Sequence, residues 1–274
     1  MSSRIELTDV RQTFLVRNDS DRQLEEFVAL DGLDLTVEAG EFCTVVGSSG
    51  CGKTTVLDLI AGLAKPTSGT VSIDGRPITG PGLDRSVVFQ QYALLPWRTA
   101  LGNVTFALEA KGGFTKAERK RIAGEYLDLV GLGEFANRLP SELSGGMKQR
   151  VAIARSLCYQ PGVLLMDEPY GALDAQTRER LQEELLDIWR RTRTTIVFIT
   201  HDIEEAVFLG QRVAVMSARP GRITKIIDVR LDRSRADTED IRATTEFAEY
   251  RHQVWSLLRQ QSARPRLKDV RGVA

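Results

Sequence analysis

A phosphate-binding loop is the strongest chemical signal in the chain. Its residues are Gly47, Ser48, Ser49, Gly50, Cys51, Gly52, Lys53 and Thr54. The glycines allow the backbone to curl so that successive N–H groups face an anion. The Lys53 ammonium can reach the β- and γ-phosphates of a nucleotide, and the Thr54 hydroxyl can bind Mg²⁺. We therefore expect this loop, together with Thr55 after it, to bind a nucleoside triphosphate.

The elements on both sides of the loop support this interpretation. Residues 41–46 are short, apolar and β-branched, which predicts a buried strand. Residues 55–61 have helical apolar spacing, and Gly62 is a suitable stop signal. A helix that begins directly after the loop adds its positive end to the anion site. A chance Gly/Ser-rich turn would not require this strand–loop–helix context.

Two carboxylates follow a second apolar strand. Residues 164–166 are apolar, and Asp167 and Glu168 come directly after them. Ligands of parallel sheets bind at the carboxyl ends of the strands. Asp167 is therefore expected to face Mg²⁺, and Glu168 to polarise an attacking water. Paired acids after a strand also serve as helix caps, but their occurrence together with Lys53 and Thr54 in one chain favours the chemical role.

A second anion site is predicted where Ser144, Gly145 and Gly146 begin a helix. A hydroxyl and free N–H groups at the positive end of a helix can bind phosphate. The alternative is an ordinary serine N-cap. Two anion sites and only one phosphate-binding loop point to a nucleotide site that is shared between two copies of the chain.

Composition restricts the possible partners. Among the 274 residues, Lys and Arg total 37 and Asp and Glu total 37, so the net charge is zero. This balance argues against a broad nucleic-acid surface, and no nucleic acid partner is expected. The three cysteines are scattered, which suits a reducing compartment. No stretch approaches the roughly 18 apolar residues of a membrane span, so we expect a soluble, cytosolic chain that reaches membranes only through partners.

The pattern of elements predicts an α/β fold. Residues 4–10 and 33–37 alternate like strands, and residues 71–78 read as a hairpin. Helical spacing prevails from about residue 91 to 160. Apolar strands then return at residues 163–166, 195–199 and 213–216, with a helix at 176–190. Strands that alternate with helices imply a mostly parallel sheet covered on both faces, here with a helical insertion at its side.

Six motifs occur in an order that closely resembles the ATPase subunit of ATP-binding-cassette (ABC) transporters. They are residues 47–54, Gln90, residues 143–149, residues 164–168, residues 172–174 and residues 200–202. The resemblance covers roughly residues 5–216. It implies a P-loop NTPase fold with a RecA-like, mostly parallel sheet, an N-terminal antiparallel β region and an α-helical subdomain. The expected ATPase domain spans residues 4–230, with the helical subdomain inserted at about 91–160.

The resemblance also assigns roles to single residues. It implies a head-to-tail dimer, either a homodimer or a pair with a second ATPase subunit. Each ATP lies between the loop of one copy and residues 144–146 of the other, and Asp174 acts across the dimer. Gln90 is expected to contact Mg²⁺ and the attacking water, and His201, after the strand at 195–199, to act as the switch histidine near the γ-phosphate. Met147 stands where the family usually has Gln, a change that activity should survive.

One nucleotide contact stays open between two aromatic residues. In this family an aromatic ring stacks on adenine, and it precedes the strand that leads into the phosphate-binding loop. Phe14 fits by its distance from the opening strand. The polar segment after it, residues 17–23, makes Phe27 a rival.

Five segments of the sequence resemble those of nitrate/sulfonate/taurine-type importers: residues 92–104, 143–157, 167–178, 200–209 and 216–223. Residues 89–99 form an exposed-looking segment with many large apolar residues, and in this family the part after Gln90 faces the membrane subunit. The resemblance implies import of a small, anionic solute through transmembrane permease subunits, supplied by a periplasmic or surface solute-binding protein. The chain would then be peripheral on the cytoplasmic side of the cell (inner) membrane. The alternatives are an exporter or lipid-handling ATPase, or a soluble non-transport ABC protein.

The last part of the chain differs in composition from the rest. Residues 231–274 are expected to form a charged helical extension, with a helix at 238–261, and a basic tail that includes residues 264–268. A solvated end is the expectation for such a tail, with contact to anionic lipid as the alternative.

Overall fold

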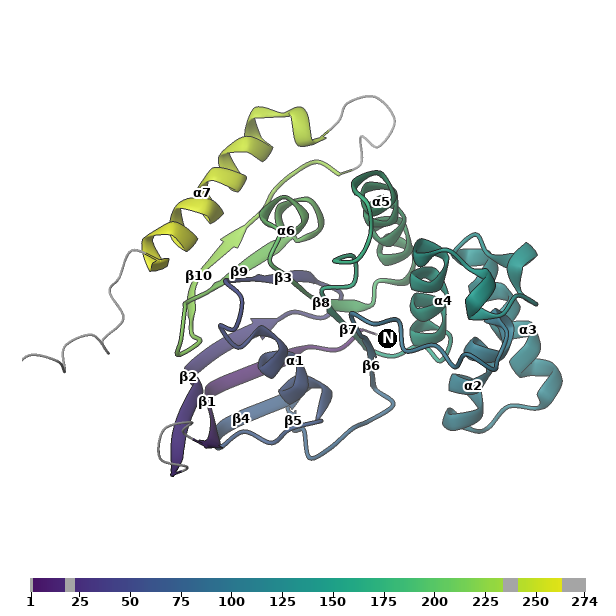
Figure 1. The fold of residues 1–274 in the computed structure, drawn as a ribbon, viewed down its shortest axis with the longest axis horizontal. Coiled ribbons are helices and arrows are strands. Elements are labelled where there is room, and N and C mark those ends of the chain that lie inside the picture. The colour runs from purple at the N-terminus through teal and green to yellow at the C-terminus, as the bar shows by residue number, and fades with distance from the viewer. Residues whose placement is uncertain (1, 18–22, 234–240, 263–274) are drawn as a thin grey trace, which may run out of the picture.

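The computed structural model describes residues 2–17, 23–233 and 241–262. A six-stranded sheet forms its centre, in the order β10-β9-β3-β8-β7-β6 (Figure 1). The strands are β3 (Phe42–Val46), β6 (Arg85–Val88), β7 (Val163–Asp167), β8 (Thr195–Thr200), β9 (Arg212–Met216) and β10 (Ile223–Asp228). All neighbours in this sheet are parallel except β10, which pairs antiparallel with β9. The predicted mostly parallel sheet is confirmed.

Both faces of this sheet are buried, as the continuous apolar strands predict. In β3, Phe42 and Val46 belong to the core on one face, and Cys43 and Val45 belong to the core on the other. The same alternation recurs in β7 and β8. The central strands are therefore rigid supports for the loops that follow their carboxyl ends.

A second, antiparallel sheet lies beside the first. Its order is β2-β1-β4-β5, and its strands are β1 (Ile5–Arg17), β2 (Leu24–Val37), β4 (Ser68–Ile73) and β5 (Arg76–Pro77). The helix α1 (Lys53–Ala61) packs between the two sheets, because its buried residues share one apolar core with strands of both (Figure 1). The hairpin turns at residues 74–75, as predicted. The strands β1 and β2 are longer than expected, because their pairing continues to Arg17 and Leu24.

Three helices form a group at one side of the parallel sheet (Figure 1): α2 (Ala100–Lys111), α3 (Lys116–Leu129) and α4 (Gly145–Leu157). Short 3-10 turns at Gly133–Phe135 and Pro140–Glu142 connect α3 to α4. The helices begin at Ala100 and not near residue 91. The segment before them is irregular, because the buried Asn103 side chain accepts from the Leu95 N–H at 2.8 Å and donates to the Arg98 carbonyl at 3.0 Å.

The remaining helices are α5 (Ala175–Thr192), α6 (Ile203–Leu209) and α7 (Thr245–Ser262). The helix α7 begins later than the predicted residue 238. A 3-10 turn at Ile241–Ala243 precedes it, and the Thr244 hydroxyl accepts from the Phe247 N–H at 3.2 Å. The basic residues 264–268 lie outside the described residues. Within the part of the chain that the structure describes, no helix is long and apolar enough to cross a membrane.

Candidate active site

The phosphate-binding loop (P-loop) connects the end of β3 to the start of α1. Gly50 and Gly52 have φ angles of 71° and 102°, a region in which a side chain is strained. Gly52 is the N-cap of α1. Ser48, Ser49 and Gly50 are exposed to solvent. The loop therefore surrounds an open position at the positive end of a helix, which suits an anion.

The thiol in this loop is turned inward. Cys51 is only 1% exposed, and a Cβ on Gly47 would lie 2.6 Å from its sulfur. Burial raises the pKa of the Cys51 thiol, so the thiol stays protonated at neutral pH. Cys51 thus fills space beneath the loop and leaves Gly47 without room for a side chain.

Lys53 crosses back over the loop. Its Nζ donates to the Gly47 carbonyl at 2.9 Å and to the Ser48 carbonyl at 3.2 Å. The side chain is 6% exposed, and Nζ lies 3.8 Å from Oε1 of Glu168. One buried cation therefore joins the loop to the end of β7.

The acidic residue at the end of β7 contacts the first turn of α1. Oγ1 of Thr54 donates to Oδ2 of Asp167 at 3.0 Å. Burial raises the pKa of Asp167, the Thr54 hydrogen bond lowers it, and the charge of Glu168 raises it. A carboxylate that is short of positive charge, next to a hydroxyl, is a donor set that fits Mg²⁺.

The described residues contain no cluster of three or more His, Cys, Asp or Glu side chains that could hold a metal ion. A cation bound at Thr54 and Asp167 would therefore need further ligands from a nucleotide or from water. Mg²⁺ is commonly held in this way, by one or two carboxylates together with substrate phosphates.

Glu168 and His201 meet because their strands are neighbours. β7 and β8 pair in parallel, so their carboxyl ends lie side by side. Oε2 of Glu168 lies 2.9 Å from Nδ1 of His201. Glu168 has a φ of 42°, and its N–H donates to the Ile199 carbonyl of β8 at 2.9 Å. The backbone of β8 thus holds the carboxylate between His201 and Lys53.

Gln90 follows β6 at the same edge of the sheet, and its side chain is exposed. A Cβ on Gly171 would lie 3.6 Å from the Gln90 amide nitrogen and 3.5 Å from the Glu168 carbonyl oxygen. Gln90 is therefore close to the turn after Glu168. No hydrogen bond is described between Gln90 and Thr54 or Asp167.

The predicted second anion site lies in a different place. Ser144 and Gly146 line a groove of about 330 Å³ between α4 and α5, and no P-loop residue belongs to its walls. The Ser144 hydroxyl accepts from the Met147 N–H at 3.3 Å. Asp174 is exposed and caps α5, where it accepts from the Thr177 N–H at 2.9 Å, a bond that lowers the pKa of this carboxyl. Ser144 and Asp174 are thus both N-caps in this chain.

The two candidate aromatic residues are neighbours on one face of the antiparallel sheet. Phe14 in β1 is directly opposite Phe27 in β2, and opposite residues of paired strands share a face. Phe14 is 42% exposed. The guanidinium carbon of Arg219 lies 5.2 Å from the centre of the Phe27 ring. The sequence around Arg219, residues 216–223, contains no signal for this contact.

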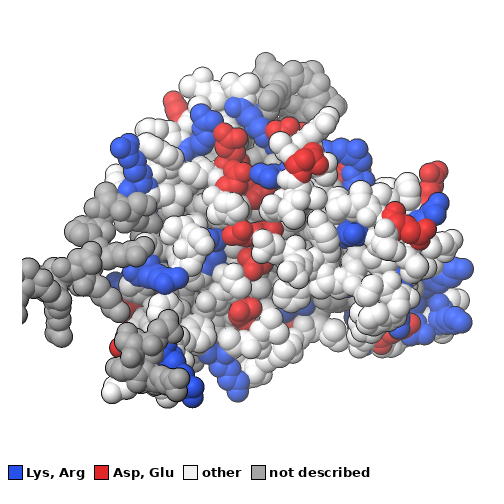
Figure 2. All heavy atoms as spheres, viewed as in Figure 1, with Lys and Arg blue, Asp and Glu red and all other residues white. Residues whose placement is uncertain are grey.

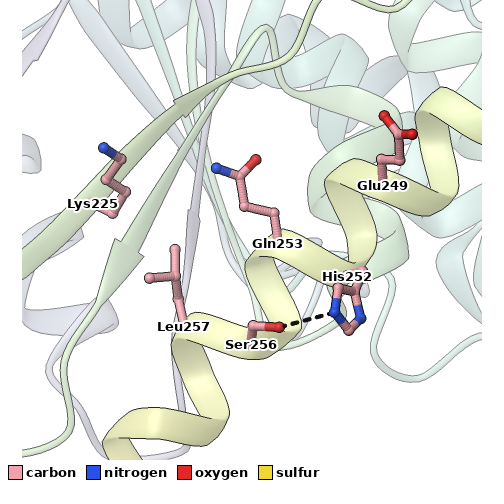
Figure 3. Close-up of a pocket in the computed structure, with 6 residues that line it drawn as sticks. All are labelled: Lys225, Glu249, His252, Gln253, Ser256 and Leu257. Carbon is pink, nitrogen blue, oxygen red and sulfur yellow. Dashed lines mark hydrogen bonds between the residues drawn. The ribbon is translucent and has the colours of Figure 1, made fainter.

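A separate groove of about 470 Å³ lies between β10 and α7 (Figure 3). His252 lies on its wall, 3.4 Å from the Ser256 hydroxyl, and stacks on Trp255. None of the P-loop residues or of the acids after β7 lines this groove.

On the face of the molecule that Figure 2 shows, Asp and Glu gather in the middle and Lys and Arg lie mostly toward the edges.

The chain is similar to known proteins. A family model described as "ABC transporter" matches residues 30–171. The nitrate import ATP-binding protein NrtD of Synechocystis sp. is 51% identical over 259 residues, which cover 93% of this chain and 95% of that protein. The bicarbonate transport ATP-binding protein CmpD of the same organism is 51% identical over 211 residues, 76% of this chain and 75% of that protein.

A solved structure matches as well. It is the dimeric, post-hydrolysis state of the ATP-binding cassette MJ0796 bound to ADP and Pi, with a TM-score of 0.70 and 36% identity. The match covers 82% of this chain and 99% of that one. The fold class predicted from the sequence is confirmed by this likeness. The chain belongs to the ATP-binding subunits of the ABC transporter family, and it is an ATP hydrolase.

Proposed function

We propose that this chain energises the import of a small anionic solute by hydrolysing ATP at a site built from the P-loop and the ends of β7 and β8. The observation that carries the proposal is the series of contacts from Lys53 through Glu168 to His201, at 3.8 and 2.9 Å. It joins a phosphate-binding cation, a candidate base and a candidate sensor of the γ-phosphate. Phosphoryl transfer depends mainly on such positioning and charge stabilisation.

Each side chain has a proposed part in this reaction. Lys53 and the N–H groups of the P-loop hold the phosphates. Glu168 accepts a proton from the attacking water, and His201 and Gln90 orient that water and the γ-phosphate. The aromatic contact to the base comes from Phe14.

The residues fit a magnesium ion. Thr54, Asp167 and Gln90 would hold it. When bound, Mg²⁺ neutralises charge on the β- and γ-phosphates. The raised pKa of Asp167 supports this assignment, because a bound cation would offset the burial and the charge of Glu168 that raise it.

The complete site is proposed to need two ATPase subunits. The groove with Ser144 and Gly146 contains no P-loop residue, so it is a suitable surface for the nucleotide of a second copy. Dimeric ABC cassettes among the similar solved structures support a dimer, which we propose to be head-to-tail. Asp174 would contact the opposite site across this interface.

Import and the solute class rest on the relatives. Their names specify nitrate and bicarbonate, which are both small anions. The partners would be transmembrane permease subunits, with a solute-binding protein on the other side of the membrane, and the chain would lie on the cytoplasmic side of that membrane. The docking segment for the permease would be residues 89–97, in which Phe89 and Trp97 are 43% and 73% exposed.

The hydrolytic part of the proposal is tested with Lys53→Ala, which should abolish ATP hydrolysis and leave the melting temperature close to that of the wild type. Lys65→Ala is the matched control, because Lys65 is exposed and follows α1 outside the site. A near-normal rate in Lys53→Ala would refute the site. The solute is tested by purifying the chain with its permease and measuring uptake of nitrate, bicarbonate and an organic sulfonate.

A further inference from the structure

The loop between β9 and β10 has a defined conformation. The Ser217 hydroxyl donates to the Pro220 carbonyl at 2.7 Å and accepts from the Arg222 N–H at 2.9 Å. The Ser217 N–H donates to the Arg222 carbonyl at 2.8 Å. These bonds connect the two ends of residues 217–222, so the backbone positions from which the side chains of this loop extend are fixed.

This loop is also attached to β2 and to the P-loop. The Gly221 N–H donates to the Ala29 carbonyl at 2.8 Å, and the Gly221 carbonyl accepts from the Asp31 N–H at 3.2 Å. A Cβ on Gly221 would collide with the carbonyl oxygen of Cys51 in the P-loop. Arg222 forms an ion pair with Asp31. The loop is therefore held against the nucleotide site by backbone contacts on both sides.

Arg219 extends from this loop into the site. Its Nε donates to the carbonyl of Gly50 at 2.8 Å, across 169 residues of sequence. A Cβ on Gly50 would lie 2.5 Å from its Nη2, so the guanidinium fills the space next to that glycine. Its guanidinium carbon lies 5.2 Å from the centre of the Phe27 ring, within the range of a cation–π contact.

The bond to Gly50 has a consequence for phosphate binding. Gly50 has no side chain and a φ of 71°, so its peptide is conformationally free unless a neighbouring group holds it. An anion site made of backbone N–H groups requires that the carbonyls point away from the anion. Arg219 holds the Gly50 carbonyl toward the loop of residues 217–222. A loop that is already ordered in this way loses less entropy when the nucleotide binds.

The contact between Arg219 and Phe27 gives the two candidate aromatic residues, Phe14 and Phe27, different roles. Since the guanidinium lies over the Phe27 ring, that ring is engaged in holding Arg219. The opposite residue, Phe14, keeps its exposed ring for the base. Phe27 and Phe14 thus differ in what they can do, although they share one face of the sheet.

From these contacts, we infer that Arg219 is a positioning residue for the nucleotide, which braces the Gly50 peptide of the P-loop against the Phe27 ring. This inference rests on the proposed ATP site. It states that Arg219 sets the affinity for the phosphates of the nucleotide through the loop, whereas Phe14 sets the contribution of the base.

The test measures binding of ADP and of inorganic pyrophosphate to the full chain by calorimetry, so that hydrolysis does not interfere. Arg219→Ala should weaken both ligands by a similar factor, on the order of tenfold, which is the scale of one lost charge-assisted hydrogen bond. Phe27→Ala should weaken both ligands as well, and the double variant should add little to the single ones. Phe14→Ala should weaken ADP and leave pyrophosphate unchanged.

Two further variants separate positioning from simple charge. Arg219→Lys keeps the positive charge but lacks the planar group that bonds Gly50 and covers the ring, and it should stay close to Arg219→Ala. Arg259→Ala is the matched control, because Arg259 lies 5.0 Å from the centre of the Trp255 ring in α7; it should bind both ligands like the wild type. In ATP hydrolysis, Arg219→Ala should raise KM and change kcat by less than about twofold, as expected when only binding is lost.

Wild-type affinity in Arg219→Ala, or full recovery in Arg219→Lys, would overturn the inference. Loss of ADP binding with unchanged pyrophosphate binding would also overturn it, because Arg219 would then act on the base. These outcomes differ from failure of the proposed function. If Lys53→Ala hydrolyses ATP normally, the site itself is wrong; if Lys53→Ala is inactive, only the role of Arg219 is at issue.

Discussion

Oε2 of Glu168 lies 2.9 Å from Nδ1 of His201, although the two residues are 33 positions apart in the chain. Adjacent parallel strands bring them together. The other oxygen of the same carboxylate faces Lys53 at 3.8 Å. Glu168 is thus oriented by one group on each side. An oriented carboxylate is what general base catalysis requires.

Removing the histidine should reduce turnover and spare binding. His201→Ala removes the contact that orients Glu168, so kcat should fall by about 10²–10⁴-fold, the usual contribution of a positioned acid–base group. The Kd for ADP should stay within about twofold, because the P-loop is intact. His252→Ala is the matched control in α7. If His201→Ala keeps the wild-type kcat, Glu168 does not depend on His201.

Blocking hydrolysis should reveal the shared site. Glu168→Gln should bind ATP, hydrolyse it very slowly and accumulate as a dimer in size-exclusion chromatography with ATP. Adding Ser144→Arg should prevent this dimer, because the large side chain fills the groove between α4 and α5.

The control for that experiment is Thr115→Arg in the same background. Thr115 caps α3 as Ser144 caps α4, but it does not line the groove. If Glu168→Gln remains a monomer with ATP, or if both arginine variants dimerise equally, the shared-site proposal fails.

The main chemical residues could be predicted because their signals are local. The P-loop is a contiguous motif, and the rule that ligands bind at the carboxyl ends of parallel strands is enough to bring Glu168 and His201 together. Arg219 could not be predicted in the same way. Its partners, Gly50 and Phe27, are distant in sequence, and only the packing of residues 217–222 against β2 brings them within reach.

The register between β1 and β2 and the boundaries of helices are the other features that the sequence does not predict. Whether Phe14 or Phe27 faces the nucleotide depends on how β1 pairs with β2, and shifts in that register follow Leu7, Val10 and Gln12. The helix α7 begins at Thr245, later than its composition predicts. The charged composition of the segment continues through the 3-10 turn Ile241–Ala243, whereas the helix itself begins only after the cap at Thr244.

A buried carboxylate in α6 should make stability depend on pH. Burial raises the pKa of Glu205 above its ordinary value of 4.5, while hydrogen bonds from Thr200 and Gln182 lower this pKa. The charge of Asp202 raises it further, and the charge of Arg178 lowers it. The folded chain therefore binds this proton more tightly than the unfolded chain. Stability should fall as the pH rises from about 4.5 through the raised pKa.

Glu205→Gln tests this expectation. The amide can still accept the bond that Gln182 donates to Oε1 at 3.0 Å, and it carries no buried charge. Its melting temperature should exceed that of the wild type at pH 7, and the difference should vanish below about pH 4.5. A lower melting temperature at pH 7 would mean that the ionised carboxylate stabilises the fold.

The segment after β10 should stabilise α6 through one arginine. Arg233 donates from Nε to the Phe208 carbonyl at 2.9 Å and from Nη2 to the Val207 carbonyl at 3.2 Å, at the end of that helix. Burial lowers its pKa to about 10, so it remains charged at pH 7. Arg233→Ala should lower the free energy of unfolding by about 1.5–3 kcal/mol, as for lost bonds to a charged donor. Arg230→Ala is a nearby control, and equal effects would contradict a specific role.

The final prediction concerns Trp97 in the docking segment. Its side chain is 73% exposed, so Trp97→Ala should leave the melting temperature and the ATPase rate of the isolated chain unchanged. If residues 89–97 contact the permease, the same variant should lower solute uptake in the assembled complex. Large aromatic residues at the centre of an interface often cost 2 kcal/mol or more when truncated, which is about 30-fold in affinity.

Trp189 provides the matched control for the same substitution. It is 5% exposed, packs edge-on against Phe42 at 5.9 Å, and donates from Nε1 to the Gly40 carbonyl at 3.1 Å. Trp189→Ala should cost about 3–5 kcal/mol and lower the melting temperature by roughly 10 °C. A comparable drop in Trp97→Ala would show that Trp97 supports the fold. An unchanged melting temperature together with full uptake would show that the docking segment does not use this residue, because neither packing nor the permease would then depend on it.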